Sequence, residues 1–255
     1  WVILFCNITA GIGILENAAP MVQDYYPALT AAAAAGFVGL LSLANMGGRF
    51  IWSSASDVIG RKNIYMVYLG VGLIFYFVVA SAGHTSLALF VVSTLILLTF
   101  YGGGFSTIPA YLRDLFGVYQ VGAIHGRLLT AWSAAGVAGP LIINMVVERQ
   151  ASRGNSGPEL YQLSLYIMCV LLAVGLIANI LVKPVHKKWF EDPGTVQAKV
   201  EADRASARAS ATTSTGSGAG SLHALAAVVL AVVIAALLVY GLWETVVKAS
   251  QMFAG

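Results

Sequence analysis

Apolar runs long enough to cross a lipid bilayer recur along almost the whole chain. A membrane-spanning helix needs about 20 predominantly apolar residues. Seven segments meet this requirement, approximately Trp1–Ala19, Ala28–Trp52, Ile64–Ala82, Leu87–Leu112, Ala123–Val147, Leu160–Val182 and Leu222–Trp243. Hydrophobic residues make up 58% of the chain and charged residues 10%, which excludes an ordinary soluble domain. The sequence therefore predicts an all-α integral membrane protein.

The basic residues of the connections fall on two opposite sides. One side contains Arg61, Lys62, Arg113, Lys183, Lys187 and Lys188, and the other has Arg149, Arg153 and Lys248. The positive-inside rule places the first group in the cytoplasm. On this topology Trp1 starts on the cytoplasmic side and the C-terminus ends outside.

Composition changes abruptly after the sixth apolar run. Residues 1–183 are predicted to form a six-helix transmembrane bundle, and residues 184–221 a flexible cytoplasmic linker that has too few apolar residues to pack a core. An additional membrane helix at 222–243 and a short tail at 244–255 follow. The chain opens with Trp1 inside an apolar run, without the features of a signal peptide, so we expect an N-terminal part of the protein to be missing.

Arg49 lies within the second apolar run. It precedes Arg61 by 12 residues, roughly 18 Å along a helix, which is near the midplane of a hydrocarbon core ~30 Å thick. A cation there costs roughly 2.5–3.5 kcal/mol, and no acidic residue of these runs is expected at its depth, since Glu16 lies toward the outer side. We therefore expect Arg49 to bind an anion; snorkelling, or pairing with a carboxylate from elsewhere, is the alternative.

A polar stripe accompanies Arg49 at helical spacing. Its members are Ser42, Asn45, Arg49, Trp52 or Ser53, and Ser56. A polar stripe is costly against lipid, so this face is predicted to line a pore or a neighbouring helix. Asn45, one turn from Arg49, is predicted to orient it or share its ligand, although a helix–helix hydrogen bond also fits.

Two further spans carry candidate site residues at depth. Tyr101, about midway along the fourth run, precedes Gly102, Gly103 and Gly104, and Pro109 follows. Glycine and proline in a membrane helix allow close packing, a bend or exposed backbone, so this stretch is a candidate helix break and gate. Trp132 lies about 15 Å into the fifth run. Tyr101 and Trp132 either line the substrate cavity or pack between helices.

Residues 57–62 read Asp-Val-Ile-Gly-Arg-Lys and resemble the D-x-x-G-R-K loop of the major facilitator superfamily. The pattern suits a tight glycine turn at Gly60, with Asp57 able to pair with Arg61 and Lys62 beside it. Three longer stretches, NITAGIGILENAAPMVQ (7–23), YGGGFSTIPAYLRDLFG (101–117) and GAIHGRLLTAWSAAGVAGP (122–140), resemble the C-terminal half of the oxalate/formate antiporter family. The resemblance covers about residues 1–183. It implies helices seven to twelve of a twelve-helix carrier in a bacterial inner (plasma) membrane.

The resemblance implies a secondary transporter of small carboxylate anions that works by alternating access, through exchange or proton coupling. The expected substrate-binding residues are then Arg49, Asn45, Tyr101 and Trp132. The expected partners of the chain are membrane lipid and the missing N-terminal half. Oxalate-exchanging members have a lysine near the middle of the eleventh helix, where this chain reads Leu129-Thr130-Ala131-Trp132-Ser133. A single intramembrane cation favours a monoanion such as formate, or a larger apolar carboxylate.

A second class of function fits the same chain. A carrier-like scaffold with a long linker also suits a non-transporting membrane partner or sensor. The fused terminal helix resembles the one-helix small subunit found beside some carriers. No nucleophile–base pair, nucleotide loop, metal cluster or nucleic-acid motif is recognisable, so neither an enzyme nor a cofactor is expected.

Overall fold

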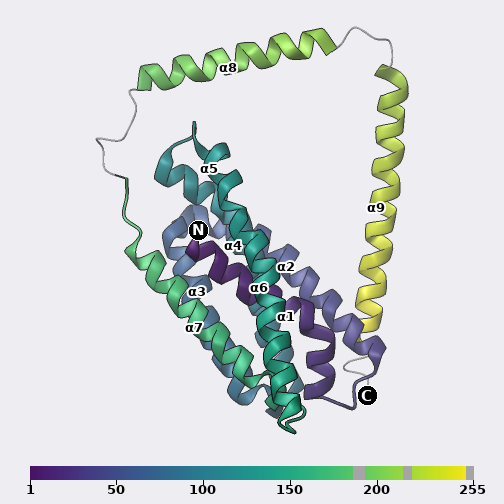
Figure 1. Cartoon of the computed structure of the whole chain (residues 1–255). Coiled ribbons are helices and arrows are strands. Elements are labelled where there is room, and N and C mark those ends of the chain that lie inside the picture. Colours follow the sequence, from purple (N-terminus) through teal and green to yellow (C-terminus); the bar gives the residue numbers. More distant parts are fainter. Residues whose placement is uncertain (186–192, 215–219, 251–255) are drawn as a thin grey trace. The chain divides into compact units, whose positions relative to one another are not determined.

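The computed structural model describes residues 1–185, 193–214 and 220–250 (Figure 1). Seven helical spans are long and apolar enough to cross a membrane among these residues, which confirms the predicted number. The helices extend beyond the predicted apolar runs at most ends, because a helix continues into the interface region after the hydrocarbon core ends. The first six form one block, and the described part of this block contains no strand.

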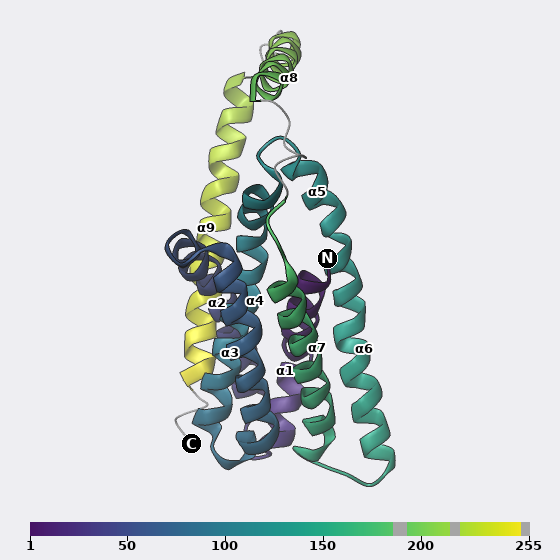
Figure 2. The ribbon, with the colours of Figure 1, turned by 90° about the vertical axis from the view of Figure 1, so that its left-hand side faces the viewer.

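The six-helix block consists of α1 (Val2–Tyr25), α2 (Ala31–Ile59), α3 (Arg61–Ala82), a 3₁₀ turn η1 (Gly83–Thr85), α4 (Leu87–Phe116), α5 (Val121–Leu128), α6 (Thr130–Ser152) and α7 (Glu159–Leu181). The long helices lie roughly along one common axis (Figure 2). Helix α1 contacts α2, α4, α6 and α7, while α3 packs against α4 and α7. The helices that carry the candidate site residues, α2, α4 and α6, are therefore neighbours of α1.

Local sequence explains where the site-bearing helices begin and end. The Thr30 side chain caps α2 by accepting a hydrogen bond from the Ala33 amide at 3.2 Å, as N-cap threonines do. Helix α2 ends at Gly60, where φ is +91°, a conformation that residues with a Cβ rarely adopt. Helix α4 ends in the same way at Gly117, with φ of +78°. Glycine thus sets the ends of both helices.

Contacts at the two ends of the block agree with the predicted grouping of loops. At one end, Arg61 lies 3.5 Å from Asp114, and Lys62 Nζ donates to the Val182 carbonyl at 2.8 Å. At the other end, the Tyr161 hydroxyl donates to Asp24 at 2.7 Å. The connections that share basic residues therefore lie together, as alternating up and down helices require. Which end faces the cytoplasm stays a prediction.

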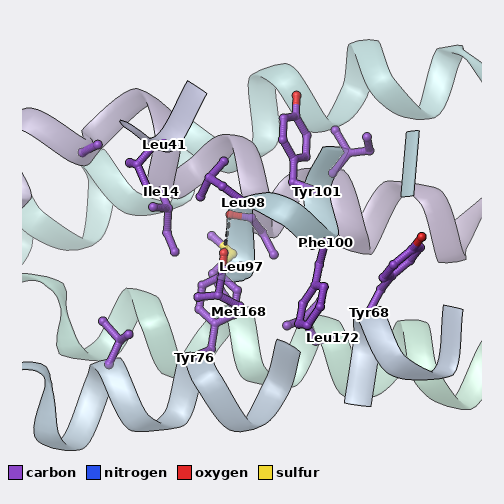
Figure 3. Packing of buried hydrophobic residues seen from close by; sticks show 14 of the residues in the cluster. Ile14, Leu41, Tyr68, Tyr76, Leu97, Leu98, Phe100, Tyr101, Met168 and Leu172 are labelled. Atoms are coloured by element: carbon purple, nitrogen blue, oxygen red, sulfur yellow. Dashed lines mark hydrogen bonds between the residues drawn. The ribbon is translucent and has the colours of Figure 1, made fainter. Parts of the chain in front are cut away.

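The interior of the block is a continuous cluster of buried side chains. Figure 3 shows members contributed by α1, α2, α3, α4 and α7, including Ile14, Leu41, Leu98, Phe100, Met168 and Leu172. Tyr76, fully enclosed, donates its hydroxyl proton to the Ala10 carbonyl at 2.6 Å. In a bilayer, lipid is as apolar as the core, so close packing and interhelical hydrogen bonds hold the helices together.

Helix continuity differs from the prediction in the fourth span. The sequence suggested a break at Gly102–Gly104 and Pro109, yet α4 is helical without interruption from Leu87 to Phe116. Pro109 only removes the backbone donor that would serve the Phe105 carbonyl. Close packing of the glycines, described below, holds the helix against α1 and α2 on the N-terminal side of the proline.

The fifth span was predicted as one helix, and the structure divides it at Leu129. Helix α5 ends at Leu128 and α6 begins at Thr130. Leu129 keeps nearly helical angles (φ −61°, ψ −17°), so the chain continues as a single span of 32 residues from Val121 to Ser152. Trp132 lies just after this local tightening.

Residues Pro184–Glu244 form a second compact unit. Part of the segment predicted as a flexible linker is helical, since α8 covers Pro193–Ser214. The prediction weighed the lack of apolar residues and overlooked the abundance of alanine, a strong helix former. Helix α9 covers Gly220–Ser250, and its membrane-length part is Val228–Lys248. The rest of the predicted linker (186–192, with Lys187 and Lys188, and 215–219) and the end of the tail (251–255) lie outside the described residues.

Candidate functional site

Arg49 is held near the middle of α2 by contacts to its own helix and to α4. Its Nε donates a long hydrogen bond to Asn45 Oδ1, one turn earlier, at 3.5 Å. The Ser106 hydroxyl of α4 donates to the Arg49 carbonyl oxygen at 3.1 Å. The guanidinium itself is exposed at the surface of the block. The structure therefore brings Asn45 and Arg49 together as predicted and leaves the charged group accessible.

Phe105 forms the surface on which the guanidinium rests. The Arg49 Cζ atom lies 5.1 Å from the centre of the Phe105 ring, within the range of a cation–π contact. The Trp132 ring packs edge-on against the same phenylalanine, with ring centres 5.4 Å apart. Sequence reasoning missed Phe105, although its position exactly one turn after Tyr101 on the same face of α4 was a usable signal.

Tyr101 connects this aromatic pair to α1. Its side chain is 8% exposed and packs so closely on Gly11 that a Cβ added there would lie 2.5 Å from the tyrosine ring. Tyr101 lies near the Trp132 side chain and is within electrostatic range of both Arg49 and Glu16. The four predicted residues therefore converge, with Phe105 among them and Glu16 at the margin.

The charges of this cluster are not neutralised in pairs. Within the described residues, the ion pairs involve Asp57, Arg61, Arg113 and Asp114, and Arg49 takes part in none. Glu16 is likewise exposed and in none of these pairs. A cation at this depth is costly without a partner. Arg49 is thus an exposed, unpaired cation on an aromatic surface, which is the chemistry that a carboxylate ligand needs.

The three glycines of α4 bring other helices into direct contact with its backbone. A Cβ added to Gly102 would lie 2.0 Å from the Asn45 carbonyl oxygen, one on Gly103 2.7 Å from the Trp52 Cβ, and one on Gly104 2.1 Å from Asn7 Nδ2. Each glycine faces a different partner, on α2 and α1, and no larger residue fits. The described geometry thus assigns a packing contact to each glycine, and a role in gating stays a prediction.

The polar stripe predicted on α2 is divided between two environments. Trp52 turns into the helix interface, where its indole Nε1 donates to Thr99 Oγ1 of α4 at 3.0 Å. Ser56 is buried and donates to the Ser53 carbonyl. The exposed polar face therefore centres on Arg49 and does not extend along the whole helix.

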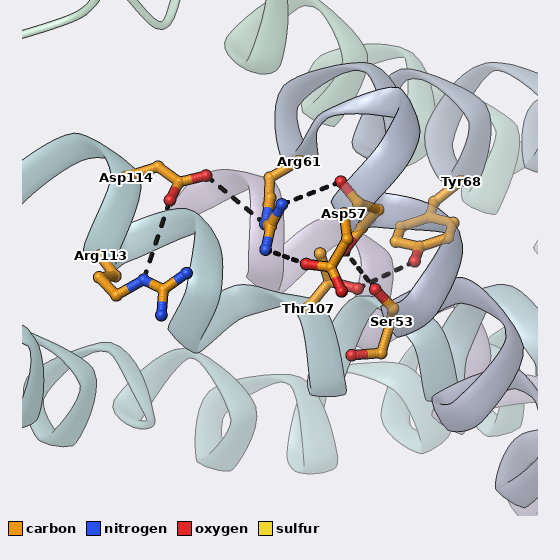
Figure 4. Close-up of polar contacts among 8 residues, drawn as sticks. Ser53, Asp57, Arg61, Tyr68, Thr107, Arg113 and Asp114 are labelled. Atoms are coloured by element: carbon orange, nitrogen blue, oxygen red, sulfur yellow. Dashed lines mark hydrogen bonds and ion pairs between the residues drawn. The ribbon is translucent and has the colours of Figure 1, made fainter.

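A second polar cluster lies at the loop between α2 and α3 (Figure 4). Arg61 pairs with Asp57 one turn before it and reaches across to Asp114 of α4 at 3.5 Å. The Arg61 side chain is 13% exposed, whereas those of Asp57 and Asp114 are 66% and 47% exposed. The glycine turn at Gly60 makes the arrangement possible because it places Arg61 directly at the start of α3.

Lys62 has a different set of contacts from Arg61. Its Nζ donates to the carbonyl oxygens of Ile180 at 3.1 Å and Val182 at 2.8 Å. The Asn179 side chain in turn donates to the Lys62 carbonyl at 3.0 Å. Lys62 therefore caps the C-terminal end of α7, where carbonyl groups lack helical partners.

No group of three or more histidine, cysteine, aspartate and glutamate side chains suited to a metal ion occurs in the part of the chain that the structure describes. Glu16 belongs to the aromatic cluster, and Asp57 and Asp114 are paired with Arg61.

The fold and the cluster define a class of protein: an integral membrane protein whose helices hold an unpaired cation at depth, as membrane transporters do. The family model of the Major Facilitator Superfamily matches residues 1–249, so the chain belongs to that superfamily of secondary transporters. The comparison with curated proteins found no match, and the comparison with solved structures found none either.

Proposed function

We propose that the protein transports small carboxylate anions, and that Arg49 binds the carboxylate. The observation that carries the proposal is the exposed guanidinium of Arg49, which lies at the middle of a membrane helix and forms no ion pair with the described residues. Arginine presents its N–H groups in a planar fork that matches a carboxylate. Asn45 occupies the Nε group, so the remaining donors are left for the ligand.

The transport mechanism is alternating access. Two six-helix bundles rock around a site near the midplane, and the binding energy of the substrate favours the occluded state. Asn45 orients the guanidinium, while Tyr101 and Trp132 form walls of the site. The loop of Asp57, Gly60, Arg61 and Lys62 ties α2 to α4 and α7 at one end, where its contacts are positioned to change when the bundles move.

The finer assignment follows from the resemblance to oxalate/formate antiporters. The resemblance implies a small organic acid of the class to which formate and oxalate belong, transported by exchange or with a proton, across a bacterial inner membrane. The single cation of the cluster supports a monoanion in preference to a dianion. In the same proposal, α4 adjusts its contacts during transport in the region of Gly102, Gly103, Gly104 and Pro109.

Uptake by the reconstituted full-length protein tests the proposal. Proteoliposomes containing the wild type, Arg49→Gln, Arg49→Lys or Arg153→Gln would be offered labelled formate, lactate and oxalate, with and without internal anion. Arg153 lies exposed at the end of α6 and controls for the loss of an arginine charge. We expect Arg49→Gln to lower uptake at least 100-fold, Arg49→Lys to retain part of it, and Arg153→Gln to leave it unchanged.

Two results would contradict the proposal. Near-normal uptake by Arg49→Gln would remove Arg49 from the site. Absence of uptake of any carboxylate, from wild-type protein shown to be folded, would favour a membrane partner or sensor instead.

A further inference from the structure

We infer that the substrate of this site is a monocarboxylate with a planar apolar body, larger than formate. The inference rests on the proposed function, because it takes Arg49 as the group that binds the carboxylate. Phe105, Trp132 and Glu16 then determine the charge and shape of the rest of the substrate.

The charge of the cluster limits the substrate to a single negative charge. Among the residues that the structure describes, Arg49 is the cation of this cluster, and Glu16 contributes a negative charge within range of Tyr101. Within this cluster, a second carboxylate on the substrate would meet no further cation, and the negative charge of Glu16 would repel it. An unpaired charge in a low-dielectric site is strongly disfavoured.

The shape of the cluster calls for an apolar body next to the carboxylate. The Phe105 ring lies beneath the guanidinium, and Trp132 packs edge-on against Phe105. Trp132 is 44% exposed, so part of its side chain is open next to Phe105. A carboxylate bound to Arg49 would therefore direct its carbon skeleton along Phe105 toward Trp132.

Formate is too small to use this surface. Its one carbon belongs to the carboxylate, so formate offers no apolar group to Phe105 or to the Trp132 ring packed against it. A flat ring such as that of benzoate makes both contacts at once. Aromatic rings favour such offset or edge-on arrangements with one another, and one apolar group in a pocket typically changes selectivity by about 10–200-fold.

Competition among three anions tests the inference. Proteoliposomes of the full-length wild type would be assayed for uptake of benzoate, formate and oxalate. The same measurements would be made with Trp132→Ala, Trp132→Phe and Phe105→Leu, and with Phe77→Leu as a matched control. Phe77 lies exposed on α3, a helix that carries none of the site residues.

We expect benzoate to have a KM at least ten-fold below that of formate, and oxalate to be a poor substrate. Trp132→Ala should raise the KM for benzoate at least ten-fold and change that for formate less than three-fold. Trp132→Phe should retain most of the preference, which shows that a loss in Trp132→Ala is not a failure to fold. Phe77→Leu should behave as the wild type.

Failure of the inference is distinguishable from failure of the proposed function. Arg49-dependent uptake that is as good for formate or oxalate as for benzoate, and indifferent to Trp132→Ala, would overturn the apolar body and leave carboxylate transport intact. Absence of uptake for all three anions would overturn both.

Discussion

A Cβ atom added to Gly48 of α2 would lie 2.2 Å from the carbonyl oxygen of Thr99 on α4. The two backbones are therefore in direct contact at the level of Arg49, and Gly102 repeats the contact one turn further along α4, against the Asn45 carbonyl. Because Asn45 and Arg49 belong to α2 while Phe105 belongs to α4, this crossing fixes the position of the cation over the ring.

The crossing makes Gly48 intolerant of substitution. Gly48→Ala should lower the thermal stability of the detergent-solubilised protein by an amount equivalent to about 1–3 kcal/mol, as overpacking does. Gly47 is the matched control, since a Cβ there meets no atom within 4 Å. Gly47→Ala should leave the melting temperature unchanged or slightly raised. Equal melting temperatures for both variants would contradict the tight crossing.

The contacts of Arg61 predict a hierarchy among the charges at its end of the block. Arg61→Gln removes the partner of both Asp57 and Asp114, whereas Asp114→Asn removes one. Since both carboxylates are partly exposed, each pair should contribute about 0.2–1 kcal/mol. A double-mutant cycle on thermal stability measures the Arg61–Asp114 coupling. Arg113→Gln is the control, because Arg113 only approaches Asp114 to 4.0 Å at an exposed position. An Arg61–Asp114 coupling energy no larger than that of Arg113–Asp114 would contradict the prediction.

Lys62 is predicted to stabilise the end of α7. Lys62→Met leaves the carbonyls of Ile180 and Val182 without this donor, and hydrogen bonds from charged groups contribute about 1.5–3 kcal/mol. We expect a lower melting temperature and faster amide hydrogen exchange at the end of α7. Lys183→Met tests the loss of a neighbouring exposed lysine and should have little effect on the melting temperature. A similar fall in melting temperature in both variants would attribute the effect to the lost positive charge and would contradict the capping role of Lys62.

Asn45 is predicted to act through Arg49. Asn45→Ala removes the acceptor of the Arg49 Nε group, so the guanidinium loses one constraint on its orientation. We expect the KM for the transported carboxylate to rise several-fold while kcat and protein yield stay near those of the wild type. In an Arg49→Lys background the same substitution should have little further effect, because contacting residues act non-additively. Full additivity would place Asn45 in the site by an independent contact.

Much of the fold follows from sequence because membrane helices leave a simple signal. Span length and basic loops predicted seven helices and the grouping of the connections, and the glycine of the D-x-x-G-R-K pattern predicted the turn at Gly60. The continuity of α4 could not be predicted from the sequence. Pro109 looked like a break, yet α4 stays helical through it, and the contacts of Gly102–Gly104 that hold α4 against its neighbours have no pattern in a single sequence.

Part of the candidate site could be predicted from the sequence. Arg49 was recognisable because a charge in an apolar run is rare, and Asn45 because it lies one turn away. Phe105 was missed, since its one weak signal was its position one turn after Tyr101, and its role appears only once Arg49 is seen above its ring. Asp114 was missed as a partner of Arg61 for a similar reason: the pair is 53 residues apart in sequence and meets only after α2, α3 and α4 have assembled.

Helix α6 is attached to its neighbours unevenly along its length. Near its start, Thr130 accepts a hydrogen bond from the Trp1 indole at 2.9 Å, and Trp132 packs against Phe105. Further along, Gly139 meets Ile12 and the Thr9 backbone through close van der Waals packing. Because a hydrogen bond holds its start and close packing on α1 holds the stretch around Gly139, a displacement of α6 would have to break both kinds of contact, and Trp132 is thereby kept against Phe105.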